Sequence, residues 1–305
     1  CSKSRIIVRV KFAEIVLIGL GCLAFWMSNT VFCYAVLFLM CTQSAFFGPS
    51  KYGIIPELAA PQHLSRANAY LEGMTYLAGV LGMAAAPALA QLTGERYPLA
   101  GIGCVVVAVV GTITSLLIRK TPAGGQSGSS HPLFFVEVWR TLRLVRQDVD
   151  LLASVFAAAV FMFLAGFAQI NLIPYGIEVC QYNAIQSGYL FVIAAIGIGI
   201  GSLWAGRLSG RSLEAGIIPF GALLFSIGTI WLAAGHSKTW IFIAIFLMGT
   251  GAGLYIVPVQ TFIQIRADRA LMGRIIAASN SLGWLGVALA SGIVSLLAGM
   301  LKMSA

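Results

Sequence analysis

Long apolar segments alternate with short polar connections along the whole chain. Nine of these segments approach the roughly 20 apolar residues that a helix needs to cross a bilayer. They lie at about residues 12–28, 31–48, 68–90, 98–118, 151–175, 185–206, 214–235, 239–263 and 275–300. Because lipid offers no partners for backbone polar groups, segments of this kind cross as helices, which satisfy those groups internally. The pattern predicts an all-α polytopic membrane protein.

The basic residues follow this alternation. Sixteen of the nineteen Lys and Arg residues fall on every second connection, and only Arg96, Lys238 and Lys302 fall on the others. Basic residues near helix ends stay on the cytoplasmic side during insertion, so the charge pattern predicts the orientation of each helix. We call the helix ends beside the sixteen residues the basic ends and expect them to be cytoplasmic. The net charge of +9 then reflects topology rather than a nucleic-acid partner, since these residues flank apolar spans.

Composition excludes several classes of protein. With 59% hydrophobic and 10% charged residues, the chain lies far from soluble domains, which average about a quarter charged residues. The six cysteines are scattered without a C-x-x-C pair, and His63, His131 and His236 are isolated outside the spans. No Walker A or G-x-S-x-G sequence occurs. We therefore expect no metal, no cofactor and no catalytic site in this chain.

The longest polar connection separates four apolar segments from five. Residues 119–150 contain the flexible stretch TPAGGQSGSS and then LFFVEVWRTLRLVRQ. In the second stretch, one helical stripe is apolar and consists of Phe135, Val138, Trp139, Leu142 and Val145. Another face is basic and consists of Arg140, Arg143 and Arg146. This spacing predicts an amphipathic helix on the anionic cytoplasmic surface, with an ordinary solvated linker helix as the alternative. The predicted organisation is an N-terminal half-bundle at 1–118, a cytoplasmic linker at 119–150 and a C-terminal half-bundle at 151–305.

A faint internal repeat extends this organisation. The basic turns SKSRIIVRVKFAE and GRLSGRSLEAG each link two apolar segments and stand six spans apart. If both are the second-to-third connection of a six-helix half, two helices precede Cys1, one follows Ala305, and about nine of an expected twelve are present. Two six-helix halves, together with GSLWAGRLSGR at 201–211, resemble the major facilitator superfamily. The G-x-x-x-G spacings at Gly197/Gly201 and Gly249/Gly253 predict close helix packing.

Three segments carry a more specific resemblance. FFGPSKYGIIPE at 46–57, SRANAYLEGMTYLAGVLG at 65–82 and YIVPVQTFIQIRADRALMGRIIAASNSLGWLG at 255–286 are similar to the lysophospholipid transporters of bacterial inner membranes. The resemblance implies movement of lysophosphatidylethanolamine and lysophosphatidylglycerol from the outer to the inner leaflet for reacylation. It also implies an acyltransferase and acyl-carrier-protein synthetase as partners, fused or separate, because the last segment is similar to the fused forms.

Few polar side chains fall at membrane depth, where a charge is costly. Glu72 lies one helical turn after Asn68, and Thr75 and Gly79 continue the same face, so this stripe is expected to line a cavity. Glu72 could pair with an amine headgroup, hold a proton, or bond a neighbouring helix structurally. Lys51, in the K-Y-G-I motif, could attract the phosphate or obey only the positive-inside rule.

Neutral amides complete the candidate substrate site. Gln260 and Gln264 stand one turn apart after Pro258, where we expect a helix break. The other two candidate amides are Asn280 and Gln169. Amides hydrogen-bond a phosphate head without adding charge, although interhelical bonding is the competing explanation. Some members of the family have an arginine near Gln169, and this chain has none there. Glu14 is expected to balance Arg9 and Lys11.

Two other functions stay open. A proton-coupled exporter of drugs or metabolites would use Glu72 as its titrating group. Alternatively, the helices could be the membrane anchor of a fused acyltransferase.

Overall fold

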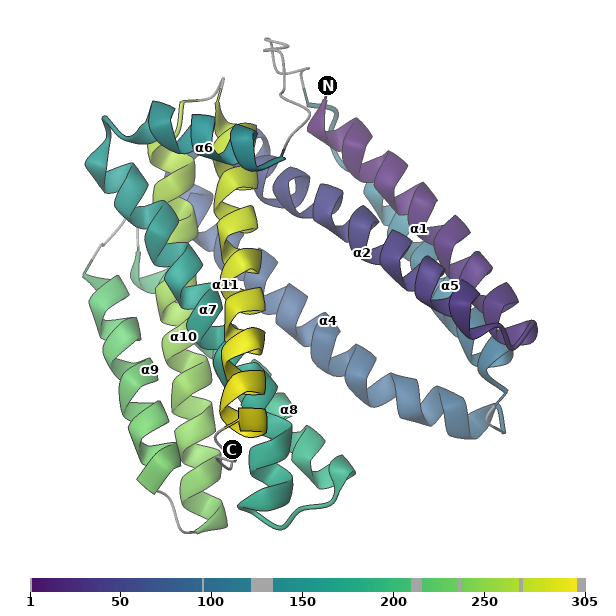
Figure 1. Cartoon of the computed structure of the whole chain (residues 1–305). Helices are drawn as coiled ribbons and strands as arrows, with labels where there is room; N and C mark the ends of the chain where they lie inside the picture. The colour runs from purple at the N-terminus through teal and green to yellow at the C-terminus, as the bar shows by residue number, and fades with distance from the viewer. Residues whose placement is uncertain are drawn as a thin grey trace. The chain divides into compact units, whose positions relative to one another are not determined.

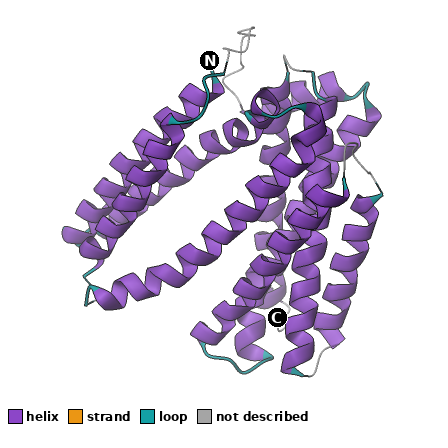
Figure 2. Ribbon diagram, turned by 180° about the vertical axis from the view of Figure 1, so that it is seen from behind, coloured by secondary structure: helices purple, strands orange, loops and turns teal. Residues whose placement is uncertain are grey.

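The structure, a computed structural model, describes residues 2–94, 96–121, 134–209, 216–234, 237–268 and 271–300. The described part is helical throughout, with loops and no strand (Figure 2). The α-helices are α1 (Lys3–Trp26), α2 (Thr30–Gly53), α3 (Ile55–Leu58), α4 (Leu64–Leu92), α5 (Tyr97–Leu116), α6 (Phe134–Val145), α7 (Val149–Glu178), α8 (Ala184–Leu208), α9 (Ile217–Ala234), α10 (Lys238–Arg266) and α11 (Met272–Met300), and Pro61–His63 form a 3-10 helix (Figure 1). The all-α prediction is confirmed, and each of the nine apolar segments coincides with a long helix.

The predicted count of nine membrane spans is not confirmed. Seven stretches among the described residues are long and apolar enough to cross a membrane, namely α2 with α3, α5, α7, α8, α9, α10 and α11. Helices α1 and α4 are as long but more polar. Helix α1 opens with four basic residues followed by Glu14, and α4 carries Arg66, Asn68 and Glu72. The seven apolar stretches show that the chain is a multi-pass membrane protein. Helices α1 and α4 are long enough to span a membrane, but each also carries polar residues.

The chain divides into two compact units, and α4 is shared between them. The first unit comprises residues 1–58 and 81–129, and the second comprises 59–80 and 130–305. Residues 64–80 of α4 therefore pack in the second unit, while its last turns belong to the first. The predicted halves at 1–118 and 151–305, joined by a linker at 119–150, have other bounds and stay a prediction.

In the first unit, α1 packs against both α2 and α5. At its basic end, the Lys3 Nζ lies 2.6 Å from Glu57 Oε1 and donates to the Gly53 carbonyl at 2.8 Å. The Ser2 hydroxyl lies 3.3 Å from the hydroxyl of Thr121, just after α5, and the Thr121 amide donates to the Ser4 hydroxyl at 3.3 Å. The start of α1 and the ends of α2 and α5 therefore lie together, as the charge pattern predicts for one side of a membrane.

In the second unit, α10 is the central helix and packs against α8, α9 and α7. A long run of its residues, from Met248 to Val259, is almost entirely buried. Glycines allow this contact, because a Cβ on Gly201 or Gly249 would collide with the backbone of the opposing helix at Thr250 or Ala194. The predicted close packing at the G-x-x-x-G spacings is confirmed.

Ion pairs join the basic ends within the second unit. The Arg266 Nε, at the end of α10, lies 2.7 Å from Asp148 Oδ2, which precedes α7. The Arg274 Nη2, at the start of α11, lies 2.5 Å from Glu137 Oε1 on α6. Helix α6 thereby crosses the basic end of α11 and contacts α7 (Figure 1).

The expected helix break at Pro258 is wrong. Helix α10 continues through Pro258 to Arg266, and α2 and α7 likewise continue through Pro49 and Pro174. A proline removes one backbone donor, and neighbouring packed helices in a membrane protein can compensate for that loss. Here Pro258 is itself buried in the contact with other helices.

Candidate functional site

A buried cluster of amide and hydroxyl groups joins α4 to α10 in the second unit. The Asn68 Nδ2 donates to Gln264 Oε1 at 2.7 Å and to Thr261 Oγ1 at 3.0 Å. In return, the Gln264 Nε2 donates to Asn68 Oδ1 at 3.1 Å. The two amides therefore form a reciprocal pair. Asn68 has no exposed surface, and Gln264 and Thr261 are only 3% and 1% exposed.

Two further polar side chains continue this cluster along the same helices. Glu72 follows Asn68 by one turn of α4, and Gln260 precedes Gln264 by one turn of α10. Both are buried, at 4% and 7% exposure. Helix α4 begins at the basic ends, where α10 finishes. Asn68 and Gln264 therefore lie nearer the basic ends, and Glu72 and Gln260 lie one turn closer to the middle of their helices. The spacing of i and i+4 keeps each pair on one face.

Small residues hold α4 close to its neighbours. A Cβ on Gly206 of α8 would lie 2.5 Å from the Ala69 Cβ, and one on Gly73 would lie 4.0 Å from the Gly199 carbonyl oxygen. Ala69 and Gly73 directly follow Asn68 and Glu72 in sequence. Helix α8 therefore packs beside the polar face that meets α10, and this packing fixes the position of both polar residues.

The other predicted site residues lie elsewhere. Lys51 belongs to the first unit, near the end of α2, where its Nζ lies 5.3 Å from the centre of the Tyr52 ring. Gln169 is exposed on α7, and Asn280 is half-buried on α11. Among the described contacts, none joins Gln169 or Asn280 to the Asn68 cluster. The structure thus brings together two of the seven predicted residues directly, with Glu72 and Gln260 one turn away.

Sequence reasoning did not select Thr261. The residue lies three positions before Gln264, which places it on nearly the same face of α10. Its hydroxyl also donates to the Val257 carbonyl at 2.8 Å. The spacing alone could have indicated it, but threonines are common in such helices, and its role depends on a partner 193 residues away.

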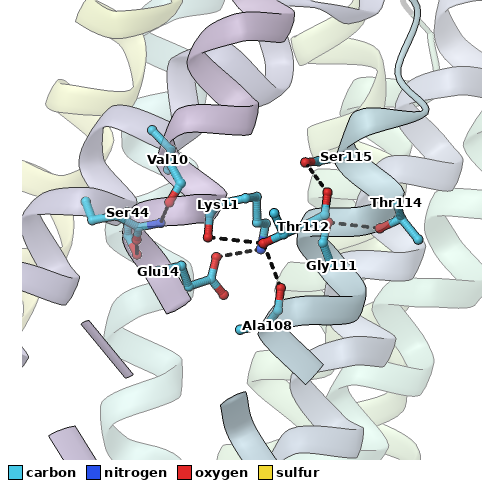
Figure 3. Close-up of polar contacts among 10 residues, drawn as sticks. Val10, Lys11, Glu14, Ser44, Ala108, Gly111, Thr112, Thr114 and Ser115 are labelled. Atoms are coloured by element: carbon cyan, nitrogen blue, oxygen red, sulfur yellow. Dashed lines mark hydrogen bonds and ion pairs between the residues drawn. The ribbon is translucent and has the colours of Figure 1, made fainter. Parts of the chain in front are cut away.

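A second polar cluster lies in the first unit (Figure 3). The Lys11 Nζ lies 2.7 Å from Glu14 Oε2, and Thr112 on α5 donates its hydroxyl to the Lys11 carbonyl at 3.2 Å. Lys11 also lies 5.3 Å from the centre of the Phe47 ring. The prediction that Glu14 balances a nearby cation is confirmed for Lys11. Both side chains are about three-quarters buried, and they neutralise each other within α1. Thr112 of α5 and Phe47 of α2 contact the same residue, Lys11.

One cavity of the second unit is separate from these clusters. It has a volume of about 520 Å³ between α7, α9, α10 and α11. Its walls are mainly apolar, with Asn171, Tyr175 and Glu178 as polar members. Asn171 donates to the Phe167 carbonyl of its own helix at 2.8 Å, and the Tyr175 hydroxyl donates to the Leu232 carbonyl at 2.9 Å. Neither contact reaches the Asn68 cluster. Among the residues that the structure describes, no three His, Cys, Asp or Glu side chains are placed to hold a metal.

Comparison with known proteins shows the family to which this bundle of apolar helices belongs. Residues 10–291 match the Major Facilitator Superfamily. The chain belongs to this family, which confirms the predicted superfamily but not the predicted count of nine spans.

Relatives with curated names resemble the chain at modest identity. The lysophospholipid transporter LplT of Enterobacter sp. (strain 638) is 27% identical over 245 residues, covering 78% of this chain and 59% of that protein. The protein of the same name from Yersinia pestis (strain Pestoides F) is 27% identical over 244 residues, covering 78% and 58%. The chain thus spans less than two thirds of the length of these relatives. The predicted resemblance to lysophospholipid transporters is confirmed.

Solved structures share the fold. The human organic anion transporter MFSD10 superposes with a TM-score of 0.81 at 14% identity, covering 97% of this chain and 72% of that one. A variant of the E. coli fucose:proton symporter FucP gives a TM-score of 0.71 at 12% identity, covering 97% and 78%. At such identities the likeness concerns the fold alone.

Proposed function

We propose that this protein is a secondary transporter that moves lysophospholipids across the bacterial inner membrane. Its substrates would be lysophosphatidylethanolamine and lysophosphatidylglycerol, carried from the outer to the inner leaflet by alternating access. The names of the LplT relatives support the substrate class. An acyltransferase with an acyl-carrier-protein synthetase, fused or separate, would then reacylate the product.

The buried cluster between α4 and α10 is the observation that carries this proposal. A lysophospholipid has one acyl tail, which lipid accommodates, and a charged head, which cannot enter hydrocarbon without partners. Asn68, Gln260 and Gln264 offer amide donors and acceptors without net charge. The buried carboxylate of Glu72 suits the ammonium group of an ethanolamine head. The cluster therefore matches both parts of a zwitterionic head.

Three further residues would act at other stages of passage. Lys51, near the basic end of α2, would attract the phosphate as the head leaves the membrane. Gln169 is exposed on α7, and Asn280 is half-buried on α11. Both would supply neutral hydrogen-bonding groups along the path. The chain has no arginine near Gln169, so the phosphate would be held by several weak donors.

Reconstituted vesicles test the proposal. The purified protein should accelerate the translocation of fluorescent lysophosphatidylethanolamine compared with protein-free vesicles. Glu72→Gln should slow this transport by roughly tenfold to a hundredfold, since a hydrogen bond to a charged group contributes about 1.5–3 kcal/mol. Asp150→Asn is the control, because the Asp150 side chain is 71% exposed at the start of α7 and lines neither the cluster nor the described cavity, and it should transport normally. Translocation no faster than in empty vesicles would reject the proposal.

The burial of Glu72 also favours a second candidate, a proton-coupled exporter of drugs or metabolites. A carboxyl group that is 4% exposed can take up a proton during a transport cycle. Transport that collapses with the proton gradient and ignores lysophospholipids would favour the exporter. Transport of lysophospholipids that persists without a proton gradient would favour the first proposal.

A further inference from the structure

Helix α6 presents a mixed aromatic and basic surface that neither the family nor the transport proposal explains. Its exposed members are Phe135 and Trp139, at 68% and 63% exposure, with Arg140, Arg143 and, just after the helix, Arg146. We call these five residues the α6 surface. At about 100° per residue, Phe135, Trp139 and Arg143 lie within about 80° of one another around the helix axis. Phe135, Trp139 and Arg143 therefore share one face of the helix.

This arrangement corrects the sequence interpretation of the helix. The sequence suggested one apolar stripe containing Phe135, Trp139 and Val145 and a separate basic face. In the structure, Val145 is only 5% exposed and faces the protein together with Thr141, whereas Phe135 and Trp139 face outward. The apolar residues are thus divided between two faces because α6 packs against α11 and α7.

Specific contacts prevent α6 from rolling. Glu137 pairs with Arg274 of α11 at 2.5 Å, and it lies on the opposite side of the helix from Trp139. Thr141 is 3% exposed and therefore lies on the packed face of α6, where its hydroxyl bonds the Glu137 carbonyl of the same helix at 2.8 Å. The α6 surface is therefore held outward by the same contacts that dock the helix.

The position of α6 places this surface beside the membrane. Helix α7, an apolar span, begins at Val149, four residues after α6 ends. Asp148 caps it by accepting a hydrogen bond from the Leu151 amide at 3.2 Å, and Arg266 fixes the same carboxylate. Helix α6 therefore lies at the level of the basic ends, which the charge pattern assigns to the cytoplasmic side of the membrane.

Charge and residue type identify the partner. Within the described part of the chain, Arg140, Arg143 and Arg146 make no ion pair with a carboxylate, whereas Glu137, Asp148 and Asp150 are near Arg274 or Arg266. The α6 surface thus keeps three positive charges beside two aromatic rings. Tryptophan prefers the headgroup level of a bilayer, and exposed basic residues attract anionic lipids.

We propose that the α6 surface docks on anionic phospholipid headgroups of the leaflet at the basic ends. Phe135 and Trp139 enter the headgroup layer, and the three arginines bind lipid phosphates. This interaction is independent of the substrate, since it involves bulk membrane lipid and no residue of the Asn68 cluster.

Hydrogen exchange of the protein in lipid nanodiscs tests the proposal. Amides of residues 134–147 should exchange more slowly in discs containing phosphatidylglycerol than in discs of phosphatidylcholine alone. The variant with Arg140→Gln, Arg143→Gln and Arg146→Gln should lose this difference. The effect should be roughly fivefold for each arginine, because a basic residue near an anionic surface contributes about 1 kcal/mol. The corresponding Lys variant should retain most of the protection.

Two controls keep the outcome clear. Arg207→Gln removes a basic residue from the end of α8 and should not change the exchange of α6. Unchanged exchange in α10 shows that each variant is folded. Equal protection in both kinds of disc would overturn the proposal and leave α6 docked only to the protein. Protection by a polyglutamate peptide but not by phosphatidylglycerol would also overturn it, in favour of an acidic protein partner.

Discussion

The reciprocal amide pair between Asn68 and Gln264 makes a quantitative prediction about stability. Asn68→Leu removes three hydrogen bonds with little change in side-chain size, and Gln264→Met removes two of the same three. Each change also removes one hydrogen-bonding partner from a buried polar group. The two substitutions therefore remove overlapping interactions and cannot act independently.

The magnitude follows from hydrogen bonding inside membranes. Bonds between membrane helices average about 0.6 kcal/mol and reach about 1.7 kcal/mol. With three short bonds lost, Asn68→Leu should lower the free energy of unfolding by about 2–3 kcal/mol, and Gln264→Met should lower it by about 1–2 kcal/mol. The double variant should cost about 1 kcal/mol less than the sum, because two of the bonds are counted in both single variants.

Reversible unfolding in mixed detergent micelles, followed by tryptophan fluorescence, provides the four free energies. Asn171→Leu is the matched control, since within the described residues the Asn171 amide bonds the Phe167 carbonyl of its own helix and no other helix, and it should cost less than about 1 kcal/mol. Strict additivity of the two cluster substitutions, to within about 0.3 kcal/mol, would refute the pairing.

Three further predictions concern packing and charge. Gly201→Leu should abolish folded yield in detergent size-exclusion chromatography, because its side chain would collide with the Thr250 backbone; normal yield would show that α8 and α10 pack differently. Arg266 and the Leu151 amide hydrogen-bond the Asp148 carboxylate and hold its pKa below the ordinary value of 3.8. A lowered pKa stabilises the fold above the ordinary value, and this stabilisation is lost as pH falls through the lowered one. The melting temperature of Asp148→Asn should therefore fall less at acidic pH than that of the wild type. Identical dependence of the two melting temperatures on pH would contradict this. Arg274→Gln should speed hydrogen exchange in α6, and unchanged exchange would show that Glu137 does not dock the helix.

The sequence predicted the helices well because their signal is local. Apolar length and alternating basic connections depend only on neighbouring residues, and the ion pairs at the basic ends agree with the predicted sides. The count of spans is less accurate. The polar residues of α1 and α4 make these two helices less apolar on average than the other long helices. The break at Pro258 was wrong because proline propensity is local, whereas the packing that keeps α10 continuous is tertiary.

The candidate site could be predicted only in part. Asn68, Glu72, Gln260 and Gln264 stand out because amides and carboxylates are rare in apolar helices and recur here one turn apart. That Asn68 meets Gln264 could not be known, because the two residues are 196 positions apart. The outward face of α6 was missed for the same reason. Its orientation depends on Arg274, which lies on a distant helix.

Photocrosslinking with a lysophospholipid tests the central claim most directly. A photoreactive group on the ethanolamine head of a lysophosphatidylethanolamine, activated in vesicles containing the protein, should label peptides at 64–76 and 255–266. The same group on the acyl tail should label other, lipid-exposed segments. Labelling of the head-group probe confined to exposed residues such as Trp284, with neither α4 nor α10 modified, would contradict the account.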